Sequence, residues 1–246
     1  MKLLDRDGVT IPFDNAWSSV AISVSGGADS ALLAYLICDN IEQQRLDTQV
    51  HFISHTRMWK TRPWQAHDSL QVFQWFVRRF PTIIFKRHTN FIAPELEYGS
   101  NGPTIIDEYN KRVSGDNIQQ RAFAEYLCHR ENISAYYNAV TCNPRDVDIP
   151  GGVVSRDIER TDTNGYLELM EHMGRYACHP FRFVEKSWVV KQYQDCRLMD
   201  LFDITRSCEG EFAEINYATY TPGQHVPVCN ECFWCKEREW AIEQNK

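Results

Sequence analysis

The sequence predicts an α/β protein, a three-layer sandwich in which helices cover both faces of a mostly parallel sheet. Short apolar runs alternate along the chain with segments of helical periodicity. The first apolar run, residues 20–24, leads into a glycine-rich turn and then an apolar segment typical of a helix. The chain has 246 residues, of which 43% are hydrophobic, so it can bury one sizeable core.

The first half of the chain alternates predicted strands and helices. Residues 2–11 are expected to form a hairpin with its turn at Asp7-Gly8. Residues 64–79 are expected to form a helix, because their apolar side chains recur at helical spacing. The other predicted elements are strands at 20–24, 49–54 and 82–85, and a helix from the glycine turn to about residue 40.

The second half continues the alternation but contains a long irregular stretch. Residues 141–163 show little periodicity, and a loop of this length in a compact protein is usually functional or mobile. Parallel sheets bind ligands at the carboxyl ends of their strands, which is where the glycine turn is expected. The predicted elements are helices at 117–130, 167–174 and 187–199 and strands at 133–140 and 202–204.

Composition and charge argue against several classes of protein. The net charge of −7 provides no overall basic field for nucleic acid or an anionic membrane. No apolar stretch approaches the ~18 residues of a membrane span, and residues 1–7 lack the apolar region of a signal peptide. The nine cysteines then indicate a reducing compartment rather than a disulfide framework. We therefore expect a cytoplasmic protein with no membrane partner, and a nucleic-acid partner is not favoured.

Residues 25–30 read Ser-Gly-Gly-Ala-Asp-Ser and carry the clearest functional signal. A strand, a glycine turn and a helix in this order present backbone N–H groups to a phosphate. Gly26 and Gly27 allow a close approach, and Ser25 and Ser30 add hydroxyl donors. Asp29 has the same charge sign as a phosphate, so it is expected to cap the helix or hold Mg²⁺. No lysine follows the glycines, which excludes a Walker loop, and the alternative is an ordinary turn.

A cluster of cysteines near the end of the chain predicts a metal site. Cys229, Cys232 and Cys235 recur at every third position, and Cys208 lies upstream of them. Four thiolates match a tetrahedral structural Zn²⁺ site, and nearby basic side chains would offset its negative charge. An iron–sulfur cluster or four reduced cysteines are the alternatives. We expect residues 1–200 to form the main domain and residues 201–246 a small zinc-binding subdomain.

The loop at residues 25–30 resembles the SGGxDS loop of the ATP pyrophosphatase, or PP-loop, superfamily. Members of that superfamily split ATP between its α and β phosphates and leave an AMP-activated substrate. The resemblance implies an adenine nucleotide alpha hydrolase-like, Rossmann-like fold with ATP and Mg²⁺ as cofactors.

Motifs in the last third of the chain resemble the 7-cyano-7-deazaguanine synthase (QueC) family of that superfamily. They are His179-Pro180-Phe181, Glu185-Lys186 before a helix, Thr205-Arg206-Ser207-Cys208, and the run from Cys229 to Arg238. The family activates the carboxylate of 7-carboxy-7-deazaguanine with ATP, lets ammonia displace AMP, and converts the amide to a nitrile. Its members often form homodimers.

The resemblance also implies roles for individual residues. Asp29 and Lys186 would act in catalysis, although Glu185 replaces the threonine that the family has before its lysine. The ATP phosphates would bind Ser25, Gly26, Gly27, Asp29 and Ser30, and the zinc would bind Cys208, Cys229, Cys232 and Cys235.

The middle of the chain departs from the family pattern. The substrate-pocket stretch Tyr-Pro-Asp-Cys-Arg does not follow residues 138–146, and residues 155–157 are a candidate replacement. The acid substrate is therefore left open. A tRNA sulfur transferase of the same superfamily and a nucleotide-binding paralogue without catalysis remain alternatives.

Several single residues allow both a functional and a structural interpretation. His55 follows a predicted strand and either lines an adenine pocket or lies in a solvated loop. Trp59 and Trp64 flank a basic segment and either stack on a base or anchor a loop. For four further residues an ordinary polar role is favoured over a catalytic or ligand-binding one: Arg156, Asp157, His172 and His179.

Overall fold

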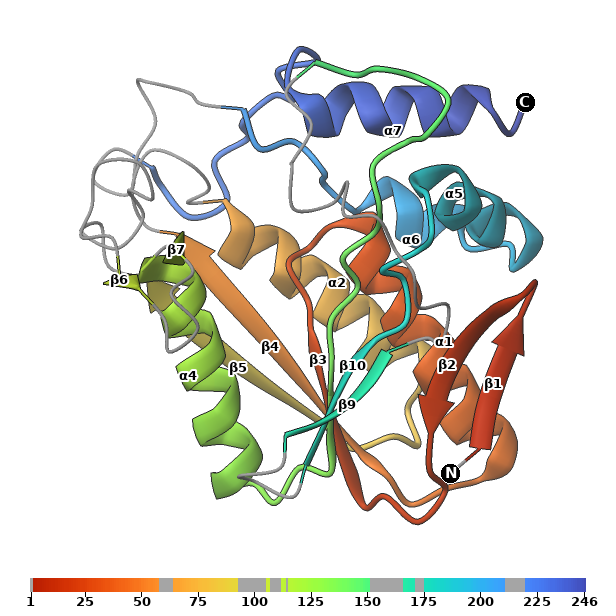
Figure 1. Cartoon of the computed structure of the whole chain (residues 1–246), viewed down its shortest axis with the longest axis vertical. Helices are drawn as coiled ribbons and strands as arrows, with labels where there is room; N and C mark the ends of the chain where they lie inside the picture. The colour runs from red at the N-terminus through yellow and green to blue at the C-terminus, as the bar shows by residue number, and fades with distance from the viewer. Residues whose placement is uncertain are drawn as a thin grey trace.

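Figure 1 shows the computed structural model of the chain. It describes residues 2–57, 64–92, 105–106, 112–113, 115–150, 166–170, 175–210 and 220–246. Within these residues, no helix combines the length and apolar character needed to cross a membrane.

Ten strands and six helices are labelled in the described parts of the chain. The strands are β1 (Lys2–Arg6), β2 (Val9–Phe13), β3 (Ser19–Ser23), β4 (Gln49–Arg57), β5 (Phe85–Ile92), β6 (Ile105–Ile106), β7 (Arg112–Val113), β8 (Ala135–Tyr137), β9 (Tyr166–Met170) and β10 (Arg175–His179). The helices are α1 (Ala28–Gln44), α2 (Gln65–Arg79), α4 (Gly115–Arg130), α5 (Lys186–Asp195), α6 (Met199–Asp203) and α7 (Phe233–Glu243).

The central sheet has six strands in the order β5-β4-β3-β8-β10-β9. The neighbours from β5 to β10 pair in parallel, and β9 pairs with β10 in the antiparallel direction at one edge. The chain builds outward from β3 to β5 in one direction and then from β8 to β10 in the other. The reversal of strand order between β3 and β8 is the position where open α/β sheets bind ligands.

Helices cover both faces of the sheet, as the sequence predicts (Figure 1). Successive side chains of a strand point to opposite faces. Val20 and Ile22 of β3 belong to the larger core, which includes the apolar residues of α1. Ala21 between them belongs to a smaller core with Leu127 of α4. The mostly parallel three-layer α/β class is therefore confirmed.

The N-terminal hairpin is confirmed as β1 paired with β2, but two predicted strands differ in position or length. The strand predicted at 82–85 lies at β5, and a turn at residues 81–83 precedes Ile84, which is 54% exposed. β5 is an edge strand and carries mainly polar side chains, which a search for apolar runs misses. The strand predicted at 133–140 is limited to β8, because the chain leaves the sheet at Asn138.

The C-terminal half contains the larger errors of prediction. The helix predicted at 167–174 is wrong, because β9 occupies its first residues and pairs with β10, a strand that was not predicted. Residues 171–174 lie outside the described residues. The helix predicted at 187–199 is divided into α5 and α6 by a turn at Arg197, whose φ is 57°. The strand predicted at 202–204 is wrong as well, since α6 extends through Asp203.

Candidate active site

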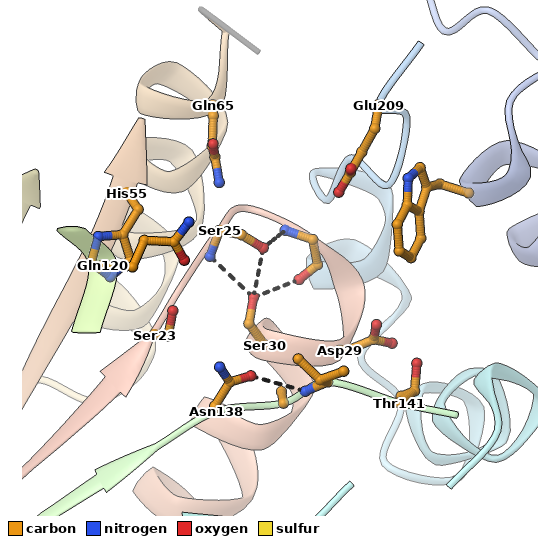
Figure 2. Close-up of a pocket in the computed structure, with 14 residues that line it drawn as sticks. Ser23, Ser25, Asp29, Ser30, His55, Gln65, Gln120, Asn138, Thr141 and Glu209 are labelled. Carbon is orange, nitrogen blue, oxygen red and sulfur yellow. Dashed lines mark hydrogen bonds between the residues drawn. The ribbon is translucent and has the colours of Figure 1, made fainter. Parts of the chain in front are cut away.

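A cavity of about 240 Å³ opens at the carboxyl ends of β3, β4 and β8 (Figure 2). It lies at the reversal of strand order, so the glycine turn, the end of β4 and the segment after β8 all contribute to it. Its lining consists of Ser23, Ser25, Gly27, Asp29, Ser30, His55, Gln65, Gln120, Asn138, Ala139, Val140, Thr141, Glu209 and Trp234.

Gly26 fixes the path of the turn between two other parts of the chain. Its φ is +87°, and a Cβ atom there would lie 2.9 Å from both the Cβ of Asp68 and the backbone nitrogen of Ser69. Glycine is therefore required for conformation and for space. On the other side, the Gly26 carbonyl accepts a hydrogen bond of 2.9 Å from the backbone N–H of Arg206. The turn is held between α2 and the C-terminal segment.

The serines of the turn bond to one another and to its backbone (Figure 2). The Ser30 hydroxyl donates to the Gly27 carbonyl at 3.1 Å, and the N–H of Ser25 donates to Ser30 Oγ at 3.3 Å. The Gly27 N–H donates to Ser25 Oγ at 3.3 Å. The first N–H groups of α1 have no acceptors within the helix, and its dipole adds positive potential there. The arrangement can bind a phosphate.

A buried ion-pair network lies beside the turn. The Lys186 ammonium pairs with the Asp29 carboxylate and lies 3.8 Å from Oε2 of Glu237 on α7. Lys186 is 3% exposed and Glu237 is fully buried, so these charges interact in a poorly solvated environment. Asp29 Oδ1 is buried and has no hydrogen-bond partner among the described residues. That free oxygen fits the predicted Mg²⁺ ligand or a bound water.

A second, adjoining cavity of about 90 Å³ is lined by two cations, Lys186 and Arg206. The Arg206 guanidinium lies 4.7 Å from the centre of the Trp64 ring and donates to the carbonyls of Val226 and Pro227. Asp68 lines the same cavity, and burial raises the pKa of its carboxyl while the Arg206 charge opposes that rise. The two cations can attract the negative charge of a polyphosphate.

The four predicted cysteine ligands come together as expected from their spacing. Their Sγ atoms all lie within 4.8 Å of one another, and Cys229 Sγ is 3.6 Å from Cys208 and 3.8 Å from Cys235. A tetrahedral ion with Zn–S bonds of ~2.3 Å separates its sulfurs by about 3.8 Å. A four-iron cluster places several metal atoms between its thiolates and needs a wider site. The sulfur positions therefore fit a single Zn²⁺ ion.

Local backbone geometry supports metal binding at these cysteines. The N–H of Cys232 donates to Cys229 Sγ at 3.3 Å. Burial raises the pKa of the Cys229 thiol, but hydrogen bonds from the N–H groups of Glu231 and Cys232 outweigh it and lower the pKa to about 6. Burial raises the pKa of the Cys235 thiol. These hydrogen bonds favour the thiolate form of Cys229, which is the form that binds a cation.

Arg238 attaches the cysteine helix to the rest of the fold. Its guanidinium donates to Thr205 Oγ1 at 2.9 Å and to the Phe202 carbonyl at 2.9 Å, and it lies 3.8 Å from the centre of the Phe202 ring. Through these contacts the segment that carries Cys208 and the helix that follows Cys232 are held together.

Some residues of the cavity were not predicted from the sequence. Glu209 and Trp234 are each next to one of the four candidate metal-binding cysteines, and that position in the sequence indicated only a metal site. Glu237, two positions after Cys235, was missed as well, because only the folded chain brings it to Lys186. The neutral amides of the cavity carried no motif, so the sequence contained no signal for Gln65, Gln120 and Asn138.

The loop after β8, for which the sequence predicts a functional or mobile segment, is held by hydrogen bonds at its start. The Cys142 N–H donates to the Val184 carbonyl at 2.8 Å, and the Arg145 N–H donates to Glu185 Oε1 at 2.9 Å. Glu185, which replaces the family's threonine, thus connects this loop to the start of α5, where Lys186 lies. The remainder of the predicted loop, from residue 151, and the candidate residues Arg156 and Asp157 lie outside the described residues.

Three of the residues for which the sequence allowed both a functional and a structural interpretation lie in the described parts of the chain. His55 is 6% exposed, lines the cavity and lies 3.2 Å from Asn90 through its Nδ1. Trp64 is 3% exposed beneath Arg206, which fits the interpretation of a loop anchor. His179 ends β10 and is not among the cavity-lining residues. Trp59 and His172 lie outside the described residues.

Comparison with known proteins identifies similarity of fold. No family model and no curated protein matches this chain. Among solved structures, the U34-tRNA thiolase NcsA from Methanococcus maripaludis with its [4Fe-4S] cluster matches with a TM-score of 0.50 and 15% identity, over 98% of this chain and 70% of that chain. A glutamine-dependent NAD+ synthetase from Acinetobacter baumannii in complex with ADP matches with a TM-score of 0.32 and 18% identity, over 52% of this chain and 22% of that chain. The chain therefore shares the fold of the solved thiolase over nearly its whole length.

Proposed function

We propose that the protein is an enzyme of the ATP pyrophosphatase superfamily that activates its substrate by transferring AMP from ATP. The observation that supports this proposal best is the glycine turn at the strand-order reversal, with Lys186 and Arg206 beside it. The turn can hold phosphates at the N-terminus of α1, and the two cations can balance their charge.

The proposed first step is an in-line displacement at the α-phosphorus of ATP. An oxygen of the acceptor forms a bond to this phosphorus, the bond to the bridging oxygen breaks, and pyrophosphate leaves with the electron pair. The N–H groups of the turn and Lys186 stabilise the charge on the departing pyrophosphate. Asp29 would hold Mg²⁺, which neutralises phosphate charge when it is bound.

We further propose that the acceptor is 7-carboxy-7-deazaguanine or a related acid, and that ammonia completes the reaction. The ammonia nitrogen bonds to the acyl carbon, AMP leaves with the electron pair, and the surplus proton passes to solvent. A second ATP activates the amide oxygen, and loss of AMP and two protons yields the nitrile. This assignment is supported by the Thr205–Cys208 segment, the run from Cys229 to Arg238 and the position of Lys186 against Asp29. In the same proposal the four cysteines bind a structural Zn²⁺.

A tRNA thiolase is the second candidate, because the match to the solved thiolase spans 98% of this chain. Sulfur would then replace an oxygen of a tRNA base after activation by ATP. The close spacing of the four sulfurs favours a single ion over the iron–sulfur cluster of that neighbour. A protein that binds nucleotide without turnover is a third outcome of the test.

The test is mass spectrometry after incubation of the zinc-loaded protein with ATP, Mg²⁺, ammonia and 7-carboxy-7-deazaguanine. We expect AMP, pyrophosphate and a product with the mass of the nitrile. Lys186→Ala should lower AMP formation by about 100-fold, whereas Lys191→Ala, an exposed lysine on the same helix, should leave it unchanged. Absence of AMP with carboxylate and tRNA acceptors would contradict the proposal, and thiolated tRNA would favour the second candidate.

A further inference from the structure

The Lys186 ammonium pairs with carboxylates from two different helices. Lys186 is the first residue of α5, Asp29 lies in the first turn of α1, and Glu237 lies on α7. The ammonium donates a hydrogen bond to Asp29, whereas Oε2 of Glu237 is 3.8 Å away, which is within reach of an ion pair but too long for a hydrogen bond. The position of the ammonium therefore depends on two attractions of unequal strength.

Of these two carboxylates, that of Asp29 belongs to the cavities and that of Glu237 does not. Among the residues that the structure describes, Asp29 lines both cavities and Lys186 lines the second, but Glu237 lines neither. Glu237 is fully buried and Lys186 is 3% exposed, so their charges interact in a medium that screens them poorly. Glu237 can therefore act on Lys186 without touching a bound substrate.

The three helices that carry these charges are fastened to one another, since α5 contacts both α1 and α7 (Figure 1). The Tyr193 hydroxyl on α5 donates to the Ala28 carbonyl at the start of α1, at 2.7 Å. Asn245, just after α7, donates through Nδ2 to the Ser187 carbonyl on α5 at 2.9 Å. The Glu237 carboxylate is therefore held in place by the fold, whereas a lysine side chain has a flexible stem of four carbons and can turn its ammonium between partners.

We propose that Glu237 is a positioning residue for Lys186. Its charge attracts the ammonium and weakens the pair with Asp29, so that the ammonium can turn toward the pyrophosphate as negative charge develops there. A neutral side chain at position 237 would leave Asp29 as the stronger partner and keep the ammonium on it. This inference rests on the proposed function, in which Lys186 stabilises the departing pyrophosphate.

A double-mutant cycle on the full zinc-loaded protein tests the inference. Its variants are Glu237→Gln, Lys186→Ala and the combination of the two, and the measured quantity is kcat for AMP formation at saturating ATP, ammonia and 7-carboxy-7-deazaguanine. We expect Glu237→Gln to lower kcat by about 10-fold in the wild-type protein, but by less than about 2-fold in the Lys186→Ala protein, where its target is missing. A residue that only supports the fold would lower kcat by the same factor in both. Glu243→Gln, which changes an exposed glutamate on α7, should lower kcat in neither.

Denaturant unfolding of the same variants provides a readout that does not depend on activity. Lys186→Ala removes the ammonium and leaves the Glu237 charge buried, so its unfolding midpoint should be lower than that of the wild-type protein. Adding Glu237→Gln should raise the midpoint again, because the double variant no longer buries that charge. The same measurement shows that each variant is folded.

The outcomes separate this inference from the proposed function. Equal factors in kcat in the two backgrounds overturn the positioning role, and so does a double variant that does not unfold at higher denaturant than Lys186→Ala. If AMP and pyrophosphate still form in either case, the proposed activation of a substrate by ATP stands. If the wild-type protein forms no AMP with carboxylate or tRNA acceptors, the proposed function itself fails, and the positioning role falls with it.

Discussion

The glycine turn and the four-cysteine segment form facing parts of one site, yet different forces hold them in place. The turn is six contiguous residues whose path is set by backbone contacts, as at Gly26 against Ser69. The cysteine segment joins Cys208 to residues more than twenty positions later through sulfur contacts. The turn is therefore formed by the sheet and helices around it, whereas the cysteine segment brings together four thiols that could hold a metal ion.

This difference suggests that the glycine turn and the cysteine segment have different roles in the site. The turn supplies N–H groups, hydroxyls and adjacent cations, which can together bind a phosphate. The cysteine segment contributes Glu209 and Trp234 to the lining of the cavity. The two regions meet in the ion-pair network of Asp29, Lys186 and Glu237. Variants that affect one region alone should reveal whether the two roles are separate.

Gly26→Ala should have the largest effect, because it disrupts the turn directly. A positive φ disfavours alanine, and the new Cβ would collide with backbone of α2 that cannot move aside. We expect a loss of about 3 kcal/mol in the free energy of unfolding and no measurable AMP formation. Denaturant unfolding and an AMP assay measure the two effects.

Gly8→Ala is the matched control for this variant. Gly8 has a φ of +79°, but nothing lies within 4 Å of an added Cβ. It should lose only about 1 kcal/mol of stability and retain activity. Equal effects of the two substitutions would show that conformation alone, and not the close approach to α2, makes Gly26 necessary.

Removal of the metal should have the second largest effect and should act mainly on the acceptor. Cys229→Ser, or treatment with a strong chelator, is expected to abolish binding of one Zn²⁺ per chain and to weaken acceptor binding by more than about 100-fold. ATP affinity should fall by less than about 10-fold, because the turn keeps its own supports. Metal analysis and calorimetry measure these quantities.

Cys196→Ser serves as the control, since Cys196 lies outside the four-cysteine cluster and bonds to Arg6. It should retain zinc and acceptor binding. An equal loss of ATP and acceptor affinity in Cys229→Ser would show that the two regions form one structural unit. A protein that contains iron and sulfide would contradict the zinc assignment.

The same contrast explains which parts of the site were predictable from the sequence. The turn is contiguous and combines its glycines with a strand and a helix, so local rules identified Ser25, Gly26, Asp29 and Ser30 as candidates. The four cysteines were recognisable by residue type and spacing. Their neighbours Glu209 and Trp234 had no distinguishing type, and only the folded chain shows that they reach the cavity.

Burial explains both which predicted strands and helices are correct and which are wrong. β3 and α1 are buried on nearly every side, so their apolar character is continuous and easy to recognise. The edge strands β5 and β9 have neighbours on one side only and carry polar or alternating residues. Their strand conformation comes from pairing, of β5 with β4 and of β9 with β10, so local patterns misplaced one and assigned the other to a helix.

Glu237→Gln tests the connection between the two regions and should have an intermediate effect. Glu237 is fully buried on the cysteine helix and faces the Lys186 ammonium. Removing its charge leaves Lys186 more strongly paired with Asp29 and less available to pyrophosphate, so we expect kcat to fall by about 10-fold with little change in KM for ATP.

Glu239→Gln is the control for this variant, because Glu239 lies on the same helix and is 64% exposed. It should retain wild-type kinetics and zinc content. A rise in KM without a change in kcat for Glu237→Gln would assign Glu237 to nucleotide binding instead of the positioning of Lys186.

The smallest expected effect concerns the sheet face beneath α4, away from both regions. His51 on β4 is fully buried, stacks on His88 and lies 3.0 Å from its Nε2. Burial, with a contribution from the His88 charge, lowers the pKa of His51 to about 4. In the unfolded chain the pKa of His51 is near 6.5, so His51 binds a proton at pH values at which it stays neutral in the folded chain.

Stability contributed by neutral His51 is therefore complete above pH 6.5 and declines as the pH falls toward 4. The free energy of unfolding should drop by about 2 kcal/mol over this interval beyond the drop seen in His51→Gln, while the exposed His129→Gln should behave as wild type. Denaturant unfolding at several pH values measures the difference. If ATP affinity of the still-folded protein fell in parallel, the sheet face beneath α4 would be coupled to the glycine turn, and the turn would be less independent than its local contacts imply.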